Sequence, residues 1–153
     1  MGRLRHMSSS IGRANRAWGI AASVLVLLPL ALAGCNPLSH SELKREVDSI
    51  GSLAAEGQLL ASDVSLDRTK ATFVRVHASE LASSADESAE KINDADVASG
   101  LEDEAKQAIK IAMDTSDALG ELEVAPGDEQ GAREVEAKLE RASKAAEMLS
   151  AKL

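Results

Sequence analysis

Apolar residues recur at alternating spacings of four and three along most of the chain, and this spacing places side chains on one face of an α-helix. The first apolar stripe predicts a helix over about 40–63, and the second predicts a helix over about 68–92. The third predicts a helix that ends near 120–123, and the fourth a helix that begins after Asp128. The four stripes, in order, are Leu43, Val47, Ile50, Ala54, Gly57, Ala61 and Val64; Val74, Ala78, Leu81, Ala85, Ser88 and Ile92; Leu101, Ala105, Ala108, Ala112, Thr115 and Leu119; and Val135, Leu139, Ala142, Ala146, Leu149 and Leu153.

Capping and turn signals separate the stripes. Ser39 and Glu42 have the spacing of a capping box before the first helix, and Ser99 and Glu102 repeat it before the third. Asp67 is a candidate N-cap for the second helix, and Asp128 for the fourth. The remaining breaks are the turns expected at 93–96 and at 126–128.

Four amphipathic helices joined by short turns predict an all-α, up-down-up-down four-helix bundle. The alternative is a pair of long helical hairpins that open or assemble with a second chain. Alanine occupies nine of the 25 stripe positions, so the helices should approach closely and leave little room for an internal ligand. Gly57 lies on the first stripe, where a missing side chain permits close approach, whereas Gly51 lies off it and has no such explanation.

The first 34 residues have a different pattern. Arg3, Arg5, Arg13 and Arg16 form a basic flank without any acidic residue, and an almost wholly apolar segment of about 16 residues follows at 18–33. This segment is shorter than the roughly 20 residues that a membrane-spanning helix needs. A basic flank, a short apolar segment and a small-residue exit predict a signal peptide, translated from its first residue or from Met7.

The exit of this leader is Leu32, Ala33, Gly34 and Cys35, which resembles the lipobox of bacterial lipoproteins at all four positions. The resemblance implies that signal peptidase II cuts between Gly34 and Cys35, that the Cys35 sulfur carries diacylglycerol, and that the new N-terminus can be acylated as well. A lone cysteine in an exported protein has no disulfide partner, which agrees with its use as a lipid carrier. The alternatives are an uncleaved anchor helix with an inert cysteine, or an ordinary secretory cut at a neighbouring alanine. The implied organisation is a signal peptide at 1–34, a lipidated tether at 35–41 and a helical bundle domain at 42–153.

The anchor would hold the protein at the outer face of the cytoplasmic membrane. Asn36 after the cysteine leaves sorting to an outer membrane open in an organism with two membranes. Without the leader the chain keeps 13 basic against 25 acidic residues, a net charge of −12. This charge argues against nucleic acid as a partner and against electrostatic adhesion to anionic lipid.

No catalytic or metal-binding pattern is present in the sequence. Neither His40 nor His77 follows a Glu at the spacing of a di-iron motif, and one cysteine cannot make a haem-attachment motif. We therefore predict no enzymatic activity, no metal ligands and no cofactor besides the lipid on Cys35. The acidic run Glu102–Glu104 is interpreted as complementing the helix dipole rather than as a cation site.

The segment 69–77 is the only part of the mature chain that is basic, aromatic and apolar together. One interpretation is a partner-docking or ligand-binding patch of Phe73, Arg75 and His77. The favoured interpretation is an ordinary helix, in which Phe73 fills the core, Arg75 is solvated and His77 pairs with Glu80.

The sequence as a whole favours a membrane-anchored, extracytoplasmic helical lipoprotein. It would act as a non-enzymatic protein-interaction or structural module, with a protein partner or by self-association. The alternative is a carrier that holds a small apolar ligand between splayed helices near Phe73 and His77.

Overall fold

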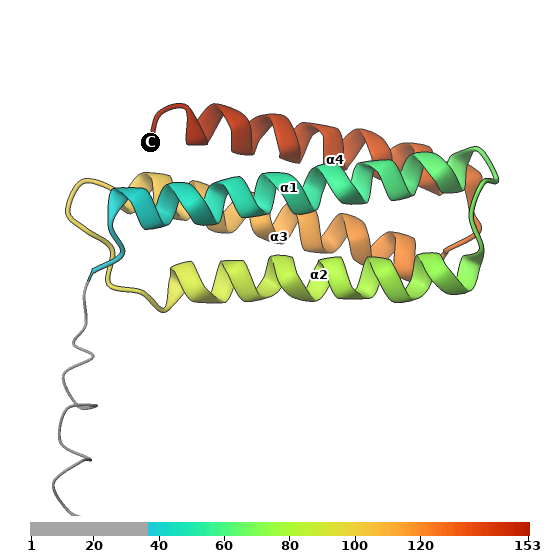
Figure 1. Ribbon diagram of the computed structural model, residues 1–153, viewed down its shortest axis with the longest axis horizontal. Coiled ribbons are helices and arrows are strands. Elements are labelled where there is room, and N and C mark those ends of the chain that lie inside the picture. Colours follow the sequence, from blue (N-terminus) through green and yellow to red (C-terminus); the bar gives the residue numbers. More distant parts are fainter. Residues whose placement is uncertain (1–36) are drawn as a thin grey trace, which may run out of the picture. The chain divides into compact units, whose positions relative to one another are not determined.

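The computed structural model describes residues 37–153, which all belong to one compact unit. Nearly all of this part of the chain is helical, and its only β-type pairing is a single bridge between Leu38 and Val97. The prediction of an all-α four-helix bundle is confirmed (Figure 1). The helices are α1 (His40–Ser65), α2 (Ala71–Asn93), α3 (Glu102–Val124) and α4 (Glu129–Ser150).

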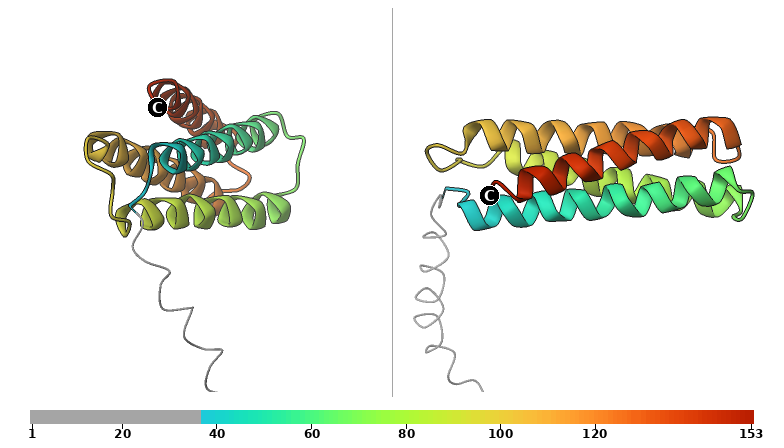
Figure 2. Two further views of the ribbon diagram at one scale, coloured as in Figure 1. Left: turned by 60° about the vertical axis from the view of Figure 1, so that its left-hand side comes forward. Right: turned by 90° about the horizontal axis from the view of Figure 1, so that it is seen from above.

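Successive helices run in opposite directions, so the connections gather at two ends (Figures 1 and 2). We call one end the tip: it carries the α1–α2 turn, 66–70, and the α3–α4 turn, 125–128. We call the other end the base: it carries the start of α1, the α2–α3 connection, 94–101, and the C-terminus.

The four helices do not contact one another equally. α1 packs most extensively along α4, and α2 along α3, whereas the α1–α2 and α3–α4 sides are less closely packed. α1 also contacts α3 across the bundle, and α2 does not contact α4. Because the first and last helices form one of the two tight pairs, the bundle is closed rather than split into two sequential hairpins.

The predicted apolar stripes form the core. All stripe positions are buried except Leu101 and Leu153, which are half-buried and pack against the core at the base. The core comprises one cluster toward the base and a second toward the tip. Ile111 and Leu122 are also buried on α3, which the stripes alone did not include.

Two glycines of α1 lie where another helix comes close. A Cβ on Gly57 would lie 2.6 Å from Cδ2 of Leu119, so the close approach expected at Gly57 is confirmed. The expectation that Gly51 has no packing reason is wrong, because a Cβ there would lie 3.1 Å from Cβ of Ala146. Small residues on both partners allow α1 and α4 to approach this closely.

The predicted caps of α1 and α4 are confirmed. The Ser39 hydroxyl accepts a hydrogen bond from the Glu42 amide at 3.3 Å, and the Glu42 carboxylate accepts one from the Ser39 amide at 2.9 Å. Asp128 caps α4 by accepting a hydrogen bond from the Gln130 amide at 3.1 Å. Both signals lie directly before their helices, where the free amides of the first turn need acceptors.

The predicted caps of α2 and α3 are wrong. Asp67 adopts a left-handed backbone with φ of 51° inside the turn, and α2 starts later, after Lys70, without a side-chain cap. Ser99 does not cap α3. Instead, the Glu102 carboxylate accepts a hydrogen bond at 2.8 Å from the amide of Gly100, whose φ of 92° turns the chain into the helix. Before α2, Asp67 is part of the turn itself. Before α3, the side chain that bonds to the turn is that of Glu102 and not that of Ser99.

The expected tether, 35–41, is already part of the folded body from Leu38 onward. The Leu38 side chain is buried, its amide donates to the Asp96 carbonyl at 2.5 Å, and its carbonyl accepts from the Ala98 amide at 3.2 Å. The start of the described chain is thereby fixed to the α2–α3 connection. Within 37–153, no helix combines the length and the apolar character needed to cross a bilayer.

Candidate functional site

The predicted patch lies on the first two turns of α2, at the tip. Phe73 is 57% exposed, so the expectation that it fills the core is wrong. The neighbouring Val74 is fully buried and takes the core position instead. Adjacent helical residues point about 100° apart, so one of these two side chains has to face away from the core.

The Phe73 ring stacks on the His77 ring, with centroids 5.3 Å apart and an interplanar angle of 29°. His77 Nε2 lies 2.9 Å from the Glu56 carboxylate on α1, and because an ionised carboxylate only accepts, the imidazole is the donor. The expected pairing of His77 with Glu80 is present but longer, at 3.8 Å. The link to Glu56 fixes the imidazole, and the imidazole supports one face of the exposed phenyl ring.

Arg75 is not brought together with these two rings. It follows Phe73 by two residues, which corresponds to about 200° around the helix, so the two side chains leave α2 on opposite sides. Val76 lies between them on the outward surface and is 55% exposed. The first turns of α2 therefore display Phe73 with His77 on the side of α1, Val76 outermost, and Arg75 on the other side.

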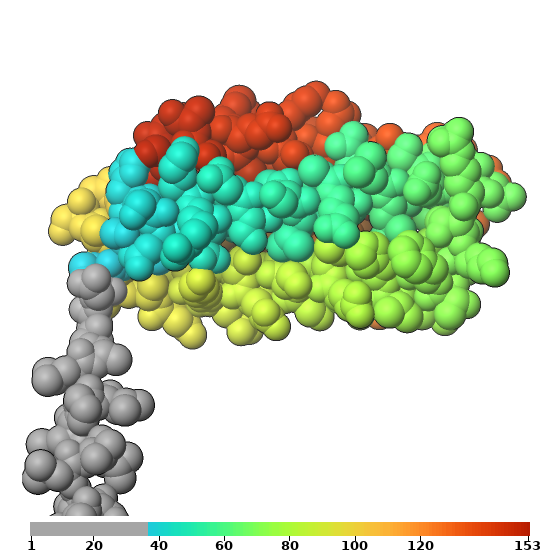
Figure 3. Space-filling view, viewed as in Figure 1, coloured from blue at the N-terminus to red at the C-terminus, as the bar shows by residue number. Residues whose placement is uncertain are grey.

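The turn before α2 extends this surface. Leu66 is 54% exposed, and Arg68 and Lys70 follow it before the helix begins. In the space-filling view the green α1–α2 turn forms the end of the molecule opposite the start of α1 (Figure 3). We call the exposed residues of this turn and of the start of α2 the tip patch, within which Arg75 lies on the far side of α2 from Phe73. The patch consists of Leu66, Arg68, Lys70, Phe73, Arg75 and Val76.

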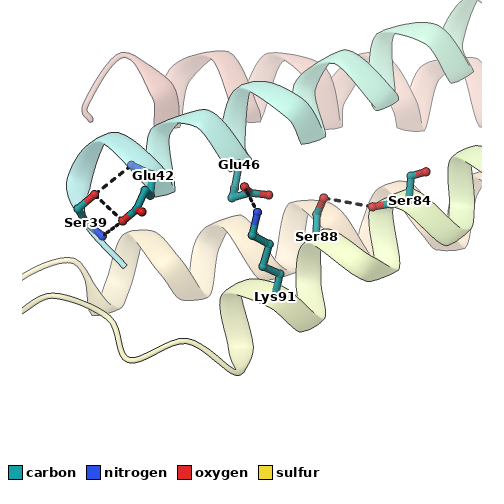
Figure 4. A network of polar contacts seen from close by, with 6 residues as sticks. All are labelled: Ser39, Glu42, Glu46, Ser84, Ser88 and Lys91. Atoms are coloured by element: carbon teal, nitrogen blue, oxygen red, sulfur yellow. Dashed lines mark hydrogen bonds and ion pairs between the residues drawn. The ribbon is translucent and has the colours of Figure 1, made fainter. Parts of the chain in front are cut away.

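A second polar feature, which the sequence did not reveal, lies between α1 and α2 nearer the base (Figure 4). Glu46 is only 8% exposed, and its carboxylate accepts a hydrogen bond at 2.5 Å from Lys91 of α2. One turn away the Ser88 hydroxyl donates to the Ser84 carbonyl at 3.1 Å. No stripe marks Glu46, and only the antiparallel pairing of α1 with α2 could have placed it opposite Lys91.

These residues line a hollow of about 340 Å³ in the α1–α2 groove. Lys91 pairs with the Glu46 carboxylate, and the hydroxyls of two lining serines, Ser84 and Ser88, donate to backbone carbonyls of α2. The Glu46–Lys91 pair links α1 to α2, two helices that are otherwise less closely packed. Every buried side-chain nitrogen or oxygen in the described part of the chain has a hydrogen-bond partner.

A hollow of about 440 Å³ lies in the groove between α3 and α4. Its floor is apolar, but its rim is charged, and Lys138 donates to both carboxylate oxygens of Glu121 at 2.6 Å across it. Neither this hollow, nor the α1–α2 hollow, nor a third between α1 and α4 is lined by Phe73 or His77. The residues around the largest of these hollows are Ile111, Asp114, Asp117, Ala118, Glu121, Lys138, Arg141, Ala142 and Ala145.

The acidic start of α3 is not arranged as a cation site. Glu102 binds the Gly100 amide, and Asp103 lies 3.4 Å from the Lys106 ammonium. Among residues 37–153, no three His, Cys, Asp or Glu side chains gather closely enough to hold a metal ion.

The predicted lipidation residue Cys35 and the peptidase recognition residues Leu32, Ala33 and Gly34 lie outside the described residues. Comparison of the chain with protein-family models, with curated proteins and with solved structures found no match. The function is therefore inferred from the residues and the geometry of this chain.

Proposed function

We propose that the protein is a lipid-anchored, non-enzymatic helical bundle that acts outside the cytoplasmic membrane as a protein-interaction or structural module. The observation that carries the proposal is the lipobox-like run Leu32–Cys35, which closes a signal-peptide pattern directly before a folded acidic body. An exposed aromatic and apolar patch at the tip supports the interaction role.

The lipid has to do the anchoring. The body carries a net charge of −12, with 13 basic against 25 acidic residues, so an anionic bilayer surface repels it. Two acyl chains hold a protein stably where one holds it only marginally, at about 0.8 kcal/mol per buried CH₂. The localisation we propose is the outer face of the cytoplasmic membrane or, in an organism with two membranes, the outer membrane.

The short tether keeps the base of the body near the membrane. Two residues, Asn36 and Pro37, separate Cys35 from the docked Leu38, and the three Cα–Cα steps span at most about 11 Å. The base would therefore stay beside the bilayer. The 26 residues of α1 correspond to about 39 Å, so the tip would stand roughly that far from the membrane when the bundle is upright.

The carrier alternative finds no specific support in the hollows. The largest of those described above has a rim of acidic and basic side chains, which favours water over an apolar ligand. The tight Ala-rich contacts between α1 and α4 also leave little space inside the bundle.

Labelling with palmitate tests the anchor. We expect the natural chain to incorporate label, and Cys35→Ser to accumulate as an unlabelled precursor that keeps its leader. Asn36→Ser is the matched control, since it changes the next residue and leaves the lipobox intact. Equal label in the natural chain and in Cys35→Ser would contradict the anchor.

Crosslinking in intact cells, followed by purification of the protein from a detergent extract, tests the interaction role. We expect a discrete crosslinked product with the natural chain, and much less of it with Cys35→Ser, which is not anchored in the same way. Failure to recover any crosslinked product, despite normal lipidation, would overturn the interaction role without affecting the anchor.

A further inference from the structure

We propose that the tip patch binds an acidic segment of a protein partner, held away from the membrane by the length of the bundle. This inference rests on the proposed function, because it names the surface and the partner chemistry of that interaction. Three features of the tip support it: exposed apolar side chains, unpaired basic side chains, and an aromatic ring that is held by its neighbours.

Exposed apolar side chains are concentrated at the tip. Seven large apolar side chains of the described residues are more than half exposed, and Leu66, Phe73 and Val76 fall within eleven residues. Their exposed fractions are 54%, 57% and 55%. Leaving this much apolar surface in water is unfavourable, and a group of such side chains is typical of a protein-binding surface.

The charge of the same segment is opposite to that of the body. Residues 66–77 contain three Arg and Lys residues and one acid, Asp67, a net charge of +2. The rest of the described chain contains ten basic and 24 acidic residues, a net charge of −14. The carboxylates of Glu56 and Glu80 lie beside His77 on the α1 side of the patch. The positive charge open to a partner is that of Arg68, Lys70 and Arg75, which form no ion pair among the described residues and therefore attract an acidic segment.

The aromatic residue of the patch is held in position before any partner arrives. The Phe73 ring rests on His77, which is fixed by its 2.9 Å bond to Glu56 of the neighbouring helix. A partner therefore loses less entropy in ordering this ring than it would with a free side chain. Aromatic and arginine side chains also carry much of the binding energy at protein interfaces.

The chemistry of the patch disfavours contact between two tips, since two surfaces of charge +2 repel each other. It favours a partner segment that places an apolar side chain against Phe73 and Val76 and carboxylates beside Arg75, Lys70 or Arg68. Such a segment would meet the tip at the end of the bundle opposite Leu38, and hence opposite the proposed lipid.

Site-specific photocrosslinking in the exporting cells tests this inference. Benzoylphenylalanine is placed at Phe73 or Val76, with Met113 and Met148 as control positions that are 54% and 62% exposed outside the patch. The full-length, lipidated protein is used, and the crosslinked peptide is identified by mass spectrometry. We expect adducts from the two tip positions, joined to a protein peptide with net negative charge, and none from the control positions.

Charge reversal supplies the second measurement. We expect Arg68→Glu, Lys70→Glu and Arg75→Glu together to lower the yield of the Phe73 adduct at least tenfold. Lys106→Glu, Lys110→Glu and Lys144→Glu make the same change in net charge on exposed residues outside the patch and should leave the yield within twofold. Circular dichroism and palmitate labelling of both variants establish that folding and lipidation are intact.

The outcomes separate this inference from the proposed function. Protein adducts from the control positions alone would overturn the tip patch and leave the interaction role standing, while no protein adduct from any position would overturn both. Adducts from the tip with lipid, with a second copy of this chain, or with a neutral or basic peptide would overturn the acidic partner. An equal loss of yield in the two charge-reversed variants would overturn the role of the three named cations.

Discussion

At the scale of single residues, the packing of the bundle depends on where a side chain is missing. Gly57 of α1 faces leucines of α3 and α4, and Gly51 of α1 faces an alanine of α4. Gly120 lies inside α3, and no atom lies within 4 Å of the position that a Cβ would take there. The same substitution should therefore have opposite effects at Gly57 and at Gly120.

We predict that Gly57→Ala destabilises the protein. The added Cβ would lie 2.6 Å from Leu119 and 3.1 Å from Leu139, and both leucines are fully buried and cannot move freely. We expect overpacking of about 1–3 kcal/mol to outweigh the gain in helix propensity of about 1 kcal/mol. Gly120→Ala is the control and should raise the free energy of unfolding by about 0.5–1 kcal/mol. Urea unfolding measures both, and stabilisation by Gly57→Ala would contradict the close contact.

The exposure of Phe73 makes a second prediction at this scale. We expect Phe73→Ala to lower the free energy of unfolding by less than about 1 kcal/mol, because its ring is more than half in water. Leu139→Ala removes a fully buried side chain and should cost about 2–5 kcal/mol. A loss with Phe73→Ala as large as with Leu139→Ala would mean that the ring belongs to the core after all.

At the scale of the helices, the α1 cap makes stability depend on pH. The Glu42 carboxylate accepts hydrogen bonds from the Ser39 hydroxyl and amide, and these bonds hold the pKa of Glu42 below its ordinary value of 4.5. A pKa that is lower in the folded than in the unfolded protein stabilises the fold above the unfolded value. That contribution is lost as the pH falls through the folded pKa.

We predict that Ser39→Ala costs about 1 kcal/mol at neutral pH. The difference from the natural protein should shrink at acidic pH, below the lowered pKa of Glu42 in the folded protein, because the protonated carboxyl no longer favours the capped form. Ser83→Ala, at an exposed position of α2, should cost nothing at either pH. Unfolding curves at the two pH values measure this, and a cost that stays constant with pH would contradict the contribution of Glu42.

The sequence predicted the helices better than the residues that lie between them. The stripes identified all four helices and most of their buried positions, because burial of one face imposes a helical period on the sequence. The caps predicted for α2 and α3 were wrong, because Asp67 and Gly100 adopt left-handed backbones that a local capping signal does not reveal.

The candidate site was harder to predict for a related reason. A stripe defines the direction of the core only to within one residue, so it could not decide whether Phe73 or Val74 faces inward. It also could not show that Arg75 leaves the helix on the far side from Phe73, or that Glu46 lies opposite Lys91. These features depend on how α2 is rotated and which helix it faces, which are properties of the assembled bundle.

At the scale of the whole molecule, the two ends have different constraints. The α1–α2 and α3–α4 turns connect the two tight helix pairs at the tip, whereas at the base the pairs are joined through Leu38 and the α2–α3 connection. In the arrangement proposed above, the base stays near the bilayer, and the length of α1, about 39 Å, limits how far the tip patch can stand from it.

We predict that Leu38→Asp loosens the base and leaves the tip intact. The substitution places a charge at a position that is only 8% exposed. It should therefore break the two backbone hydrogen bonds that join Leu38 to Asp96 and Ala98 of the α2–α3 connection. Hydrogen exchange should show the Ala98 amide, which donates to the Leu38 carbonyl, losing most of its protection. The Asp67 amide, which donates to the Val64 carbonyl at the tip, should change little. Leu59→Asp, at a position 69% exposed, is the control and should alter neither amide. Unchanged protection of Ala98 in Leu38→Asp would contradict this role of Leu38 and show that the base holds without it.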